Sequence, residues 1–229
     1  MPGWSRATLT HNDVVAPGLH RVTLNVSTEV ARGFQAPGQY HRVRVANGKD
    51  SVFAIASPPG QAHFEYLVRA NQGVAGALTR LAVGADVEVS RPDGPGFPLE
   101  QAKGRTLLVI GTGTGYAPLR SVLHSVRARR AEFGRVHGLY GAHEPAQLAW
   151  REEFSALSEA GIHVTPTVSH TAHGWAGAVG RVQQLVAKLP TEGAIAFLCG
   201  QMEMVAEVTQ LLATHGVPNE RVFLNYPTG

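Results

Sequence analysis

Three glycines whose spacing can hold a phosphate stand near the middle of the chain. Gly111, Gly113 and Gly115 follow an apolar run at residues 106–110. Glycine lets the backbone take positive φ and approach a ligand closely, and the start of a following helix offers unpaired N–H groups and a partial positive charge. Pro118 suits the first turn of that helix, and the apolar spacing after it is helical. This strand, turn and helix pattern predicts a phosphate-binding site.

A second apolar run ends in residues that could border the same ligand. Residues 194–198 lead into Cys199 and Gly200. Open parallel sheets bind ligands at the carboxyl ends of their strands, so we expect this exit beside the glycine-rich turn. Cys199 is then either a ligand-facing thiol or a small hydrophobic residue. Met204 lies on a helical apolar face and is interpreted equally as a core residue or as a ligand contact.

The composition argues against several other kinds of site. Lys plus Arg number 20 against 17 for Asp plus Glu, and they are scattered, so a nucleic-acid surface is not indicated. A single cysteine forms no internal disulfide, iron–sulfur cluster or cysteine-rich zinc site. The 11 histidines show no metal-ligand spacing, and no segment approaches ~18 consecutive apolar residues. We therefore expect a cytoplasmic protein without a metal site or a membrane span.

The first part of the chain alternates between apolar and polar residues, as strands with one buried face do. The segments with this alternation are residues 21–26, 40–45, 64–68 and 87–89. Breaks rich in Gly and Pro separate them, and one short helix is expected at about residues 75–81. The pattern predicts an antiparallel β-barrel domain over residues 1–98.

From residue 106 onward the pattern changes to nearly continuous apolar or valine-rich segments that alternate with helical ones. These segments are residues 107–110, 136–140, 162–168 and 195–198. Continuous apolar strands are buried on both faces, which requires helices on both sides of a parallel sheet. We therefore predict an α/β domain over residues 104–229, and with it a two-domain fold.

Three segments together resemble the ferredoxin–NADP⁺ reductase-like superfamily. The family's GTGxGxxP segment stands at residues 111–118, its CGxxxM segment at residues 199–204 and an altered form of its RxYSxAS strand at residues 51–57. The resemblance covers nearly the whole chain. Within the family, the chain more specifically resembles a subgroup typified by a plant fruit protein, whose members carry motifs similar to its FxIASPP at residues 53–59 and LCGQ at residues 198–201. It implies an antiparallel barrel that binds FAD and an α/β domain that binds NAD(P)H.

The resemblance also implies a role for each matching position. Cys199 would lie beside the nicotinamide as the catalytic residue. The barrel positions that would contact FAD are Phe53, Ala54, Ile55, Ala56, Ser57, Leu67, Val68, Arg69, Gly73, Ala75 and Gly76. The remaining cofactor-binding positions are Gly111, Thr112, Gly113, Thr114, Gly115, Pro118, His143, Ser169, Gly200, Met204 and Tyr226.

The flavin motif departs from the family pattern at three positions. Ser51 stands where the family has an arginine that pairs with the FAD diphosphate, and Phe53 and Ala54 replace a tyrosine and a serine beside the flavin ring. Losing one charge-assisted hydrogen bond weakens binding by about 1.5–3 kcal/mol. Arg69 or Arg44 could supply the missing charge. Bound FAD, weakly held flavin and no flavin all stay open.

Two further departures concern the nucleotide and the chain end. His143 and His170 stand where members that favour NADP(H) often carry arginine. Neutral imidazole cannot offer a two-pronged hydrogen bond to a 2′-phosphate, so NADH and NADPH are both allowed, and both histidines are equally interpreted as plain surface residues. Tyr226 is the candidate for stacking on the flavin, provided that the last three residues turn away, whereas Phe223 is expected in the last core strand.

The function that follows is hydride transfer from NAD(P)H to a bound flavin, with electrons passing to an acceptor outside the chain. That acceptor could be a partner protein, a quinone, free flavin or oxygen. Two alternatives stay open: a non-catalytic NAD(P)-binding protein that has lost FAD, and a subunit that transfers electrons only within a complex.

Overall fold

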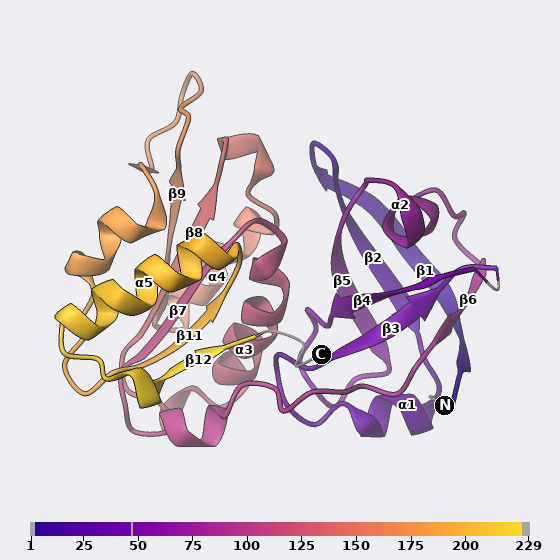
Figure 1. The fold of residues 1–229 in the computed structure, drawn as a ribbon, viewed down its shortest axis with the longest axis horizontal. Coiled ribbons are helices and arrows are strands. Elements are labelled where there is room, and N and C mark those ends of the chain that lie inside the picture. The colour runs from indigo at the N-terminus through magenta and orange to yellow at the C-terminus, as the bar shows by residue number, and fades with distance from the viewer. Residues whose placement is uncertain (1–2, 47, 226–229) are drawn as a thin grey trace.

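The computed structural model describes residues 3–46 and 48–225, which form two six-stranded sheets side by side (Figure 1). The N-terminal sheet is antiparallel, in the order β4-β3-β6-β1-β2-β5. Its elements are β1 (Ser5–Ala16), β2 (Leu19–Asn25), α1 (Thr28–Gly33), β3 (Tyr40–Arg44), β4 (Asp50–Ala54), β5 (His63–Arg69), α2 (Gly73–Thr79) and β6 (Asp86–Val89). The sheet curls around a core of its own, as predicted for the first half of the chain.

Two elements of this half were not predicted. Strand β1 is the longest, yet its register shifts between Leu9 and His11 and again between Val14 and Ala16. Each irregularity interrupts the alternation of inward and outward side chains, so no regular pattern marks the strand. Helix α1 has only six residues and begins after Ser27, whose hydroxyl accepts a hydrogen bond from the Val30 N–H.

The barrel has a seam between its edge strands β4 and β5. No ladder joins these strands in the described part of the chain. A single backbone hydrogen bond, from the Ala56 N–H to the Glu65 carbonyl oxygen at 2.7 Å, connects them just beyond the end of β4. Backbone groups along the rest of the seam are thus free of cross-strand partners, and this side of the barrel faces the second sheet.

The C-terminal sheet is entirely parallel, in the order β10-β9-β8-β7-β11-β12. Its strands and helices are β7 (Leu107–Thr112), α3 (Tyr116–Ala128), β8 (Val136–Ala142), α4 (Phe154–Glu159), β9 (Ile162–Val168), β10 (Ala178–Val179), β11 (Ile195–Cys199), α5 (Met202–Thr214) and β12 (Val222–Leu224). The 3₁₀ helices are η1 (Leu99–Ala102), η2 (Gly113–Gly115), η3 (Arg130–Glu132), η4 (Pro145–Gln147), η5 (Arg151–Glu153), η6 (Val182–Lys188) and η7 (Asn219–Arg221). The predicted α/β architecture is confirmed.

Strand β7 shows why its apolar run is continuous. Leu107 and Val109 pack in a core with α3 and α4, whereas Leu108 and Ile110 pack on the other face of the sheet with α5 and η6. All four side chains are essentially inaccessible to solvent. Phe223 lies in β12 beside the ring of Phe197, as expected for the last core strand.

The two halves share a packed interface. Phe97, at the exit of the barrel, stacks on Phe197 of β11 with ring centroids 4.8 Å apart. Leu19 and Leu67 of the barrel belong to the same buried cluster as α3. The connecting segment is therefore part of a core, and the domain limits at residues 98 and 104 stay a prediction.

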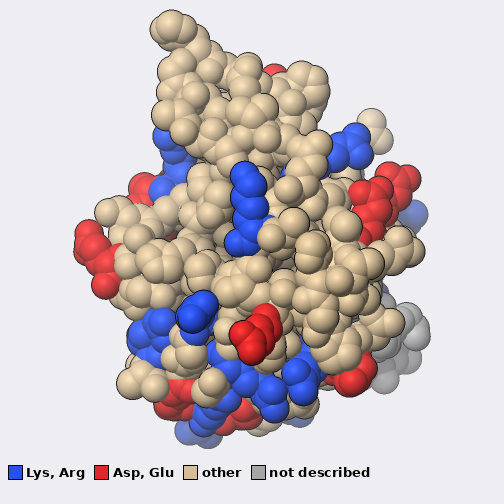
Figure 2. Space-filling view, turned by 90° about the vertical axis from the view of Figure 1, so that its left-hand side faces the viewer, with Lys and Arg blue, Asp and Glu red and all other residues tan. Residues whose placement is uncertain are grey.

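The outer end of the α/β half carries charges of both signs. Figure 2 shows Lys and Arg interspersed with Asp and Glu on the lower part of this face, whereas the upper part is largely uncharged. Residues 169–180, which follow β9, contain no Asp, Glu, Lys or Arg. None of the described helices is long and apolar enough to cross a membrane, and the described residues contain no cluster of three or more His, Cys, Asp or Glu suited to a metal ion.

Candidate functional site

A cleft of about 1190 Å³ lies between the two sheets and is lined by residues of both. Its barrel wall comes from β3, β4, β5 and α2, and its opposite wall from the glycine-rich turn, the ends of β8 and β9, and the exit of β11. The predicted residues in these walls are Phe53, Ala54, Leu67, Val68, Arg69, Ala75, Thr112, Gly113, Thr114, Gly115, Pro118, His143, Ser169, Cys199, Gly200 and Met204. Segments chosen separately from the sequence thus meet in one space.

Other predicted residues lie outside the cleft walls. Ile55 packs in the barrel core and Ala56 in the core between the sheets. The Ser57 hydroxyl accepts a hydrogen bond from the Glu65 N–H. Gly73, Gly76 and Gly111 also do not line the cleft. Tyr226 lies outside the described residues, and the cofactor roles of all these positions stay predictions.

The glycine-rich turn has the geometry that a phosphate cradle needs. Gly113 has φ = +56°, a conformation that residues with a side chain rarely adopt. A Cβ on Gly115 would lie 2.6 Å from the Cys199 carbonyl oxygen, so only glycine lets the turn pack against the end of β11. The turn leads directly into α3, whose first-turn residues include Pro118, as predicted. The Tyr116 N–H donates back to the Gly113 carbonyl oxygen, so η2 and α3 form one continuous helical start at the cleft, and a helix N-terminus favours anions.

Thr112, in the cleft wall, carries a hydroxyl that fits a polar ligand. Its Oγ1 atom is buried and has no hydrogen-bond partner in the described part of the protein. A buried hydroxyl without a partner costs about 1–3 kcal/mol, so such groups usually meet a ligand, water or ion. The hydroxyl lies against Gly200, in the space that a side chain there would occupy. The turn and this hydroxyl together fit a phosphate-bearing nucleotide.

Cys199 lies in the cleft wall as a neutral thiol. Burial raises the pKa of its thiol to about 12, against a weak hydrogen bond to the Asn225 carbonyl oxygen at 3.9 Å that acts in the opposite direction. A thiol is a nucleophile only when it is ionised. Cys199 is therefore not suited to nucleophilic or proton-transfer chemistry at neutral pH, and a catalytic role for it would be limited to contact with the reacting ring.

The comparisons with known proteins agree with this geometry. Residues 109–210 match the oxidoreductase NAD-binding domain family. The chain is 30% identical over 225 residues to fruit protein pKIWI502 of Actinidia deliciosa, covering 89% of this chain and 70% of that protein. It is 34% identical over 190 residues to ferredoxin–NADP reductase B of Sorangium cellulosum, covering 74% of this chain and 75% of that enzyme. The chain belongs to the ferredoxin–NADP⁺ reductase-like superfamily.

A solved structure shows the same fold over nearly the whole chain. The ferredoxin NADP⁺ reductase of Neisseria gonorrhoeae, crystallised with bound FAD and NADP, superposes with a TM-score of 0.83 at 20% identity. The match covers 96% of this chain and 97% of that one. Both halves and their relative arrangement therefore share the fold of that reductase.

The barrel wall of the cleft contains two aromatic residues, Phe53 and Tyr40, of which only Phe53 was predicted as a site residue. Phe53 is 9% exposed because its ring packs in the barrel core, edge-to-face with Tyr66 at 6.3 Å. Tyr40, the ladder partner of Ala54, is half-buried and lines the cleft. The sequence carried this signal, because alternation along residues 40–44 places Tyr40 on the face opposite the buried His41 and Val43.

The structure separates the two candidates for the missing flavin-side charge. Arg44 donates two hydrogen bonds to Glu88, at 2.6 and 2.8 Å, and its guanidinium lies over the Trp4 ring, away from the cleft. Arg69 is exposed in the cleft wall, and its Nη2 atom lies 3.7 Å from the position of a Cβ on Gly113. Arg69 is thus the arginine that can reach a phosphate bound between the barrel and the glycine-rich turn.

The nucleotide end of the cleft carries a cluster of polar side chains. His143 Nδ1 lies 3.2 Å from the Ser169 hydroxyl, and the rings of His143 and His170 lie 4.0 Å apart. Arg181 lines the same cleft at the start of η6 and was not predicted as a site residue. Its only signal in the sequence is the glycine-rich segment directly before it, with Gly174, Gly177 and Gly180. The nucleotide end therefore does contain an arginine, one strand farther along the sheet.

Proposed function

We propose that the chain is an NAD(P)H-dependent flavin reductase module that passes electrons to an acceptor outside itself. The observation that carries the proposal is the single cleft that joins the glycine-rich turn of the α/β half to the seam of the barrel. A hydride acceptor held on the barrel and a nucleotide held on the turn would share one cleft. Membership of the reductase-like superfamily supports FAD and NAD(P)H as these cofactors.

The barrel wall fits a flavin in shape and polarity. Leu19, Leu67 and Ala75 give it apolar surface, and Tyr40 adds an aromatic ring. Backbone groups of the seam are available as hydrogen-bond partners. Because Ser51 carries no charge, the diphosphate would depend on Arg69 and on backbone N–H groups. We infer a bound FAD that is held less tightly than in relatives with the full motif.

The residues of the α/β half hold and align the nucleotide. The start of α3 and the backbone of Gly113 to Gly115 would hold the diphosphate, and the Thr112 hydroxyl would accept or donate a hydrogen bond beside it. Cys199 and Gly200 would keep water from the reacting ring. A bound flavin accepts a hydride from reduced nicotinamide and releases electrons one or two at a time. The protein therefore contributes alignment and exclusion of water rather than an acid or a base.

Two finer points belong to the same proposal. We propose that residues 1–98 form the flavin-binding domain and residues 104–229 the nucleotide-binding domain, because each sheet has its own core. The acceptor is an external molecule, and a protein partner is one candidate for it.

The test is an absorption spectrum of the purified chain after incubation with FAD and removal of the excess. Flavin bands that bleach on anaerobic addition of NADH or NADPH are expected, and titration with each nucleotide decides which is preferred. Gly113→Val, in the glycine-rich turn, should prevent this bleaching. Its matched control is Gly193→Val, because Gly193 also has a positive φ, of +63°, but lies in a turn outside the cleft walls. Protein that binds NAD(P)H but takes up no FAD would overturn the proposal.

Binding of NAD(P)H without uptake of FAD would instead support the alternative, a nucleotide-binding protein without redox activity. The observation that favours it is the missing positive charge at Ser51. It predicts unchanged nucleotide affinity in the presence and absence of FAD.

A further inference from the structure

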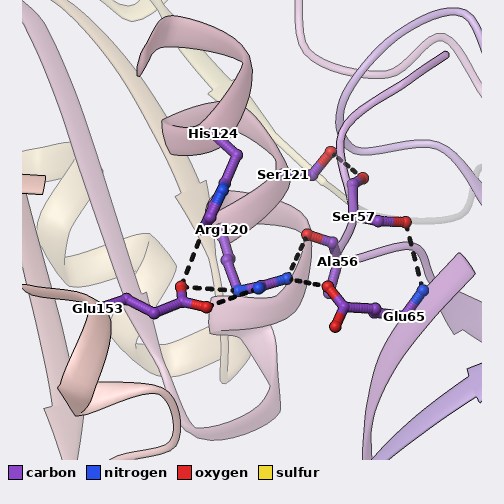
Figure 3. A network of polar contacts seen from close by, with 7 residues as sticks. All are labelled: Ala56, Ser57, Glu65, Arg120, Ser121, His124 and Glu153. Atoms are coloured by element: carbon purple, nitrogen blue, oxygen red, sulfur yellow. Dashed lines mark hydrogen bonds and ion pairs between the residues drawn. The ribbon is translucent and has the colours of Figure 1, made fainter. Parts of the chain in front are cut away.

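A buried arginine in α3 connects the two halves of the protein (Figure 3). Arg120 is 6% exposed. Its Nη1 atom donates hydrogen bonds to the Glu65 carboxylate at 2.6 Å and to the Ala56 carbonyl oxygen at 3.3 Å, both in the barrel half. Its Nε and Nη2 atoms donate to the two carboxylate oxygens of Glu153 at 2.9 and 2.6 Å. The guanidinium also lies over the Trp150 ring at 4.5 Å. One side chain thus holds groups from both halves of the protein.

A second contact between the halves lies one residue away. The Ser121 hydroxyl donates a hydrogen bond to the Ser57 carbonyl oxygen at 2.7 Å, and the Ser57 hydroxyl accepts one from the Glu65 N–H (Figure 3). His124, one turn after Arg120, lies 2.9 Å from Glu153 through its Nε2 atom. Arg120 and Ser121, in the second turn of α3, are therefore bonded to the segment that closes the barrel seam.

Glu153 and Arg120 stay ionised although both lie largely out of solvent. Burial opposes ionisation of Glu153, but hydrogen bonds from His124 and Arg120 outweigh it and lower the pKa of Glu153 to about 2. Burial alone would lower the pKa of Arg120, whereas hydrogen bonding and charge from Glu153 and Glu65 raise it above its usual range. A buried ion cluster is a weak means of stabilising an interface, because well-packed apolar side chains do as much. Its distinctive property is geometric. The planar guanidinium has its N–H donors in fixed positions, so it fixes the orientation of every group that it binds.

The cluster lies directly behind both walls of the cleft. Arg120 lies one turn after the start of α3, which follows Gly115 directly. On the barrel side, Glu65 precedes Leu67 and Arg69 on β5, and Ala56 follows Ala54 of β4. These flanking residues, unlike Ala56 and Glu65 themselves, line the cleft. The hydrogen bonds of Arg120 therefore join the turn that would hold NAD(P)H to the two strands that would hold flavin.

We propose that Arg120 is a positioning residue that fixes the distance between the two cofactor sites. The proposal rests on the proposed function for its catalytic consequence, but its structural part concerns the two halves alone. Without Arg120, each half keeps its own core and binding groups, and the relative placement of the halves loosens. Misplacing reacting groups by about 1 Å can lower a rate about 100-fold.

The experiment compares three variants with a matched control. Arg120→Gln removes both the charge and the planar set of N–H donors. Arg120→Lys keeps the charge but lacks the planar set of donors. The double variant Arg120→Gln/Glu65→Gln leaves fewer unpaired buried charges and guards against misfolding of the single variant. Arg127→Gln is the control, because Arg127 is exposed in the last turn of the same helix.

Three measurements are made on each variant: the dissociation constant for NAD(P)H, the single-turnover rate of flavin bleaching, and hydrogen–deuterium exchange at residues 55–57. For Arg120→Gln and the double variant we expect a bleaching rate about 10- to 100-fold lower, with NAD(P)H affinity within about threefold of the parent. Exchange at residues 55–57 should rise in both. Arg120→Lys should recover part of the rate, and Arg127→Gln should match the parent.

Either of two results would overturn the proposal. One is a folded Arg120→Gln variant with parental bleaching rate and parental exchange. The other is a parallel loss of nucleotide affinity, rate and folded fraction, which would indicate a purely structural role. If the parent takes up no FAD, the proposed function fails, and exchange at residues 55–57 alone decides whether Arg120 holds the halves together.

Discussion

His41 makes the barrel sensitive to acid, and replacing it should remove that sensitivity. The ring is fully buried inside the barrel, where Nε2 accepts a hydrogen bond from the Tyr66 hydroxyl at 2.6 Å and Nδ1 donates to the Ser90 carbonyl oxygen at 3.3 Å. Burial lowers the pKa of His41 from 6.5 to about 4, against the opposing effect of the Ser90 hydrogen bond. The imidazole is therefore neutral in the folded protein at neutral pH.

The sign and size of the effect follow from this shift. Between pH 6.5 and 4 the unfolded chain binds a proton at His41 that the folded chain does not, so the free energy of unfolding falls as the pH falls. The stability that depends on a neutral His41 is present above pH 6.5. About 2 kcal/mol of it should be lost between pH 7 and pH 5, and about 3 kcal/mol by pH 4.

The assay is urea unfolding of the parent and of His41→Gln at pH 7, 6, 5 and 4. Glutamine can keep both hydrogen bonds but does not titrate, so the variant should lose about 2 kcal/mol less than the parent between pH 7 and pH 5. Carboxylates that titrate in the same range contribute equally to both proteins and cancel in the difference. His63→Gln, an exposed substitution in β5, is the matched control and should follow the parent. Equal acid losses in His41→Gln and the parent would refute the reasoning.

Three further predictions concern the cleft. Gly113→Val should abolish NAD(P)H binding as measured by calorimetry, because a β-branched residue does not adopt φ = +56°. The control Gly193→Val should bind NAD(P)H normally. Unchanged affinity in Gly113→Val would refute the assignment of the turn as a phosphate-binding site. Thr112→Val should weaken NAD(P)H binding about fivefold, yet leave the unfolding midpoint unchanged or higher, because it removes a buried hydroxyl without a partner. Since burial raises the pKa of Cys199 to about 12, the native thiol should react with iodoacetamide at pH 8 about 1000-fold more slowly than the same thiol in urea, and rapid alkylation of the folded protein would contradict this.

Sequence patterns predicted the α/β half well because its signals are local. A continuous apolar run such as residues 107–110 is compatible with few structures other than a buried parallel strand, and the glycines and Pro118 fix the turn that follows. In the barrel the same reasoning failed for β1, whose bulges break the alternation, and it did not single out Tyr40 as a residue of the cleft wall.

The parts of the site that were not predicted depend on contacts between distant residues. Arg120 and Glu65 are 55 positions apart, and no pattern in either segment reveals that they meet. Arg181 reaches the cleft only because β10 adds beside β9 at the edge of the sheet. Arg44 and Arg69 were both candidates for the missing flavin-side charge. Only the structure shows that the Arg44 guanidinium is already hydrogen-bonded to Glu88.

The open seam between β4 and β5 changes what a degenerate flavin motif means. Backbone N–H and C=O groups are the same whatever side chain a residue carries, so recognition through the seam survives substitutions such as those at Ser51 and Ala54. A ligand bonded along the seam would act as an additional strand and complete the barrel. Side-chain motifs would then underestimate how many chains of this fold keep a flavin, and barrel stability should rise with the concentration of the ligand.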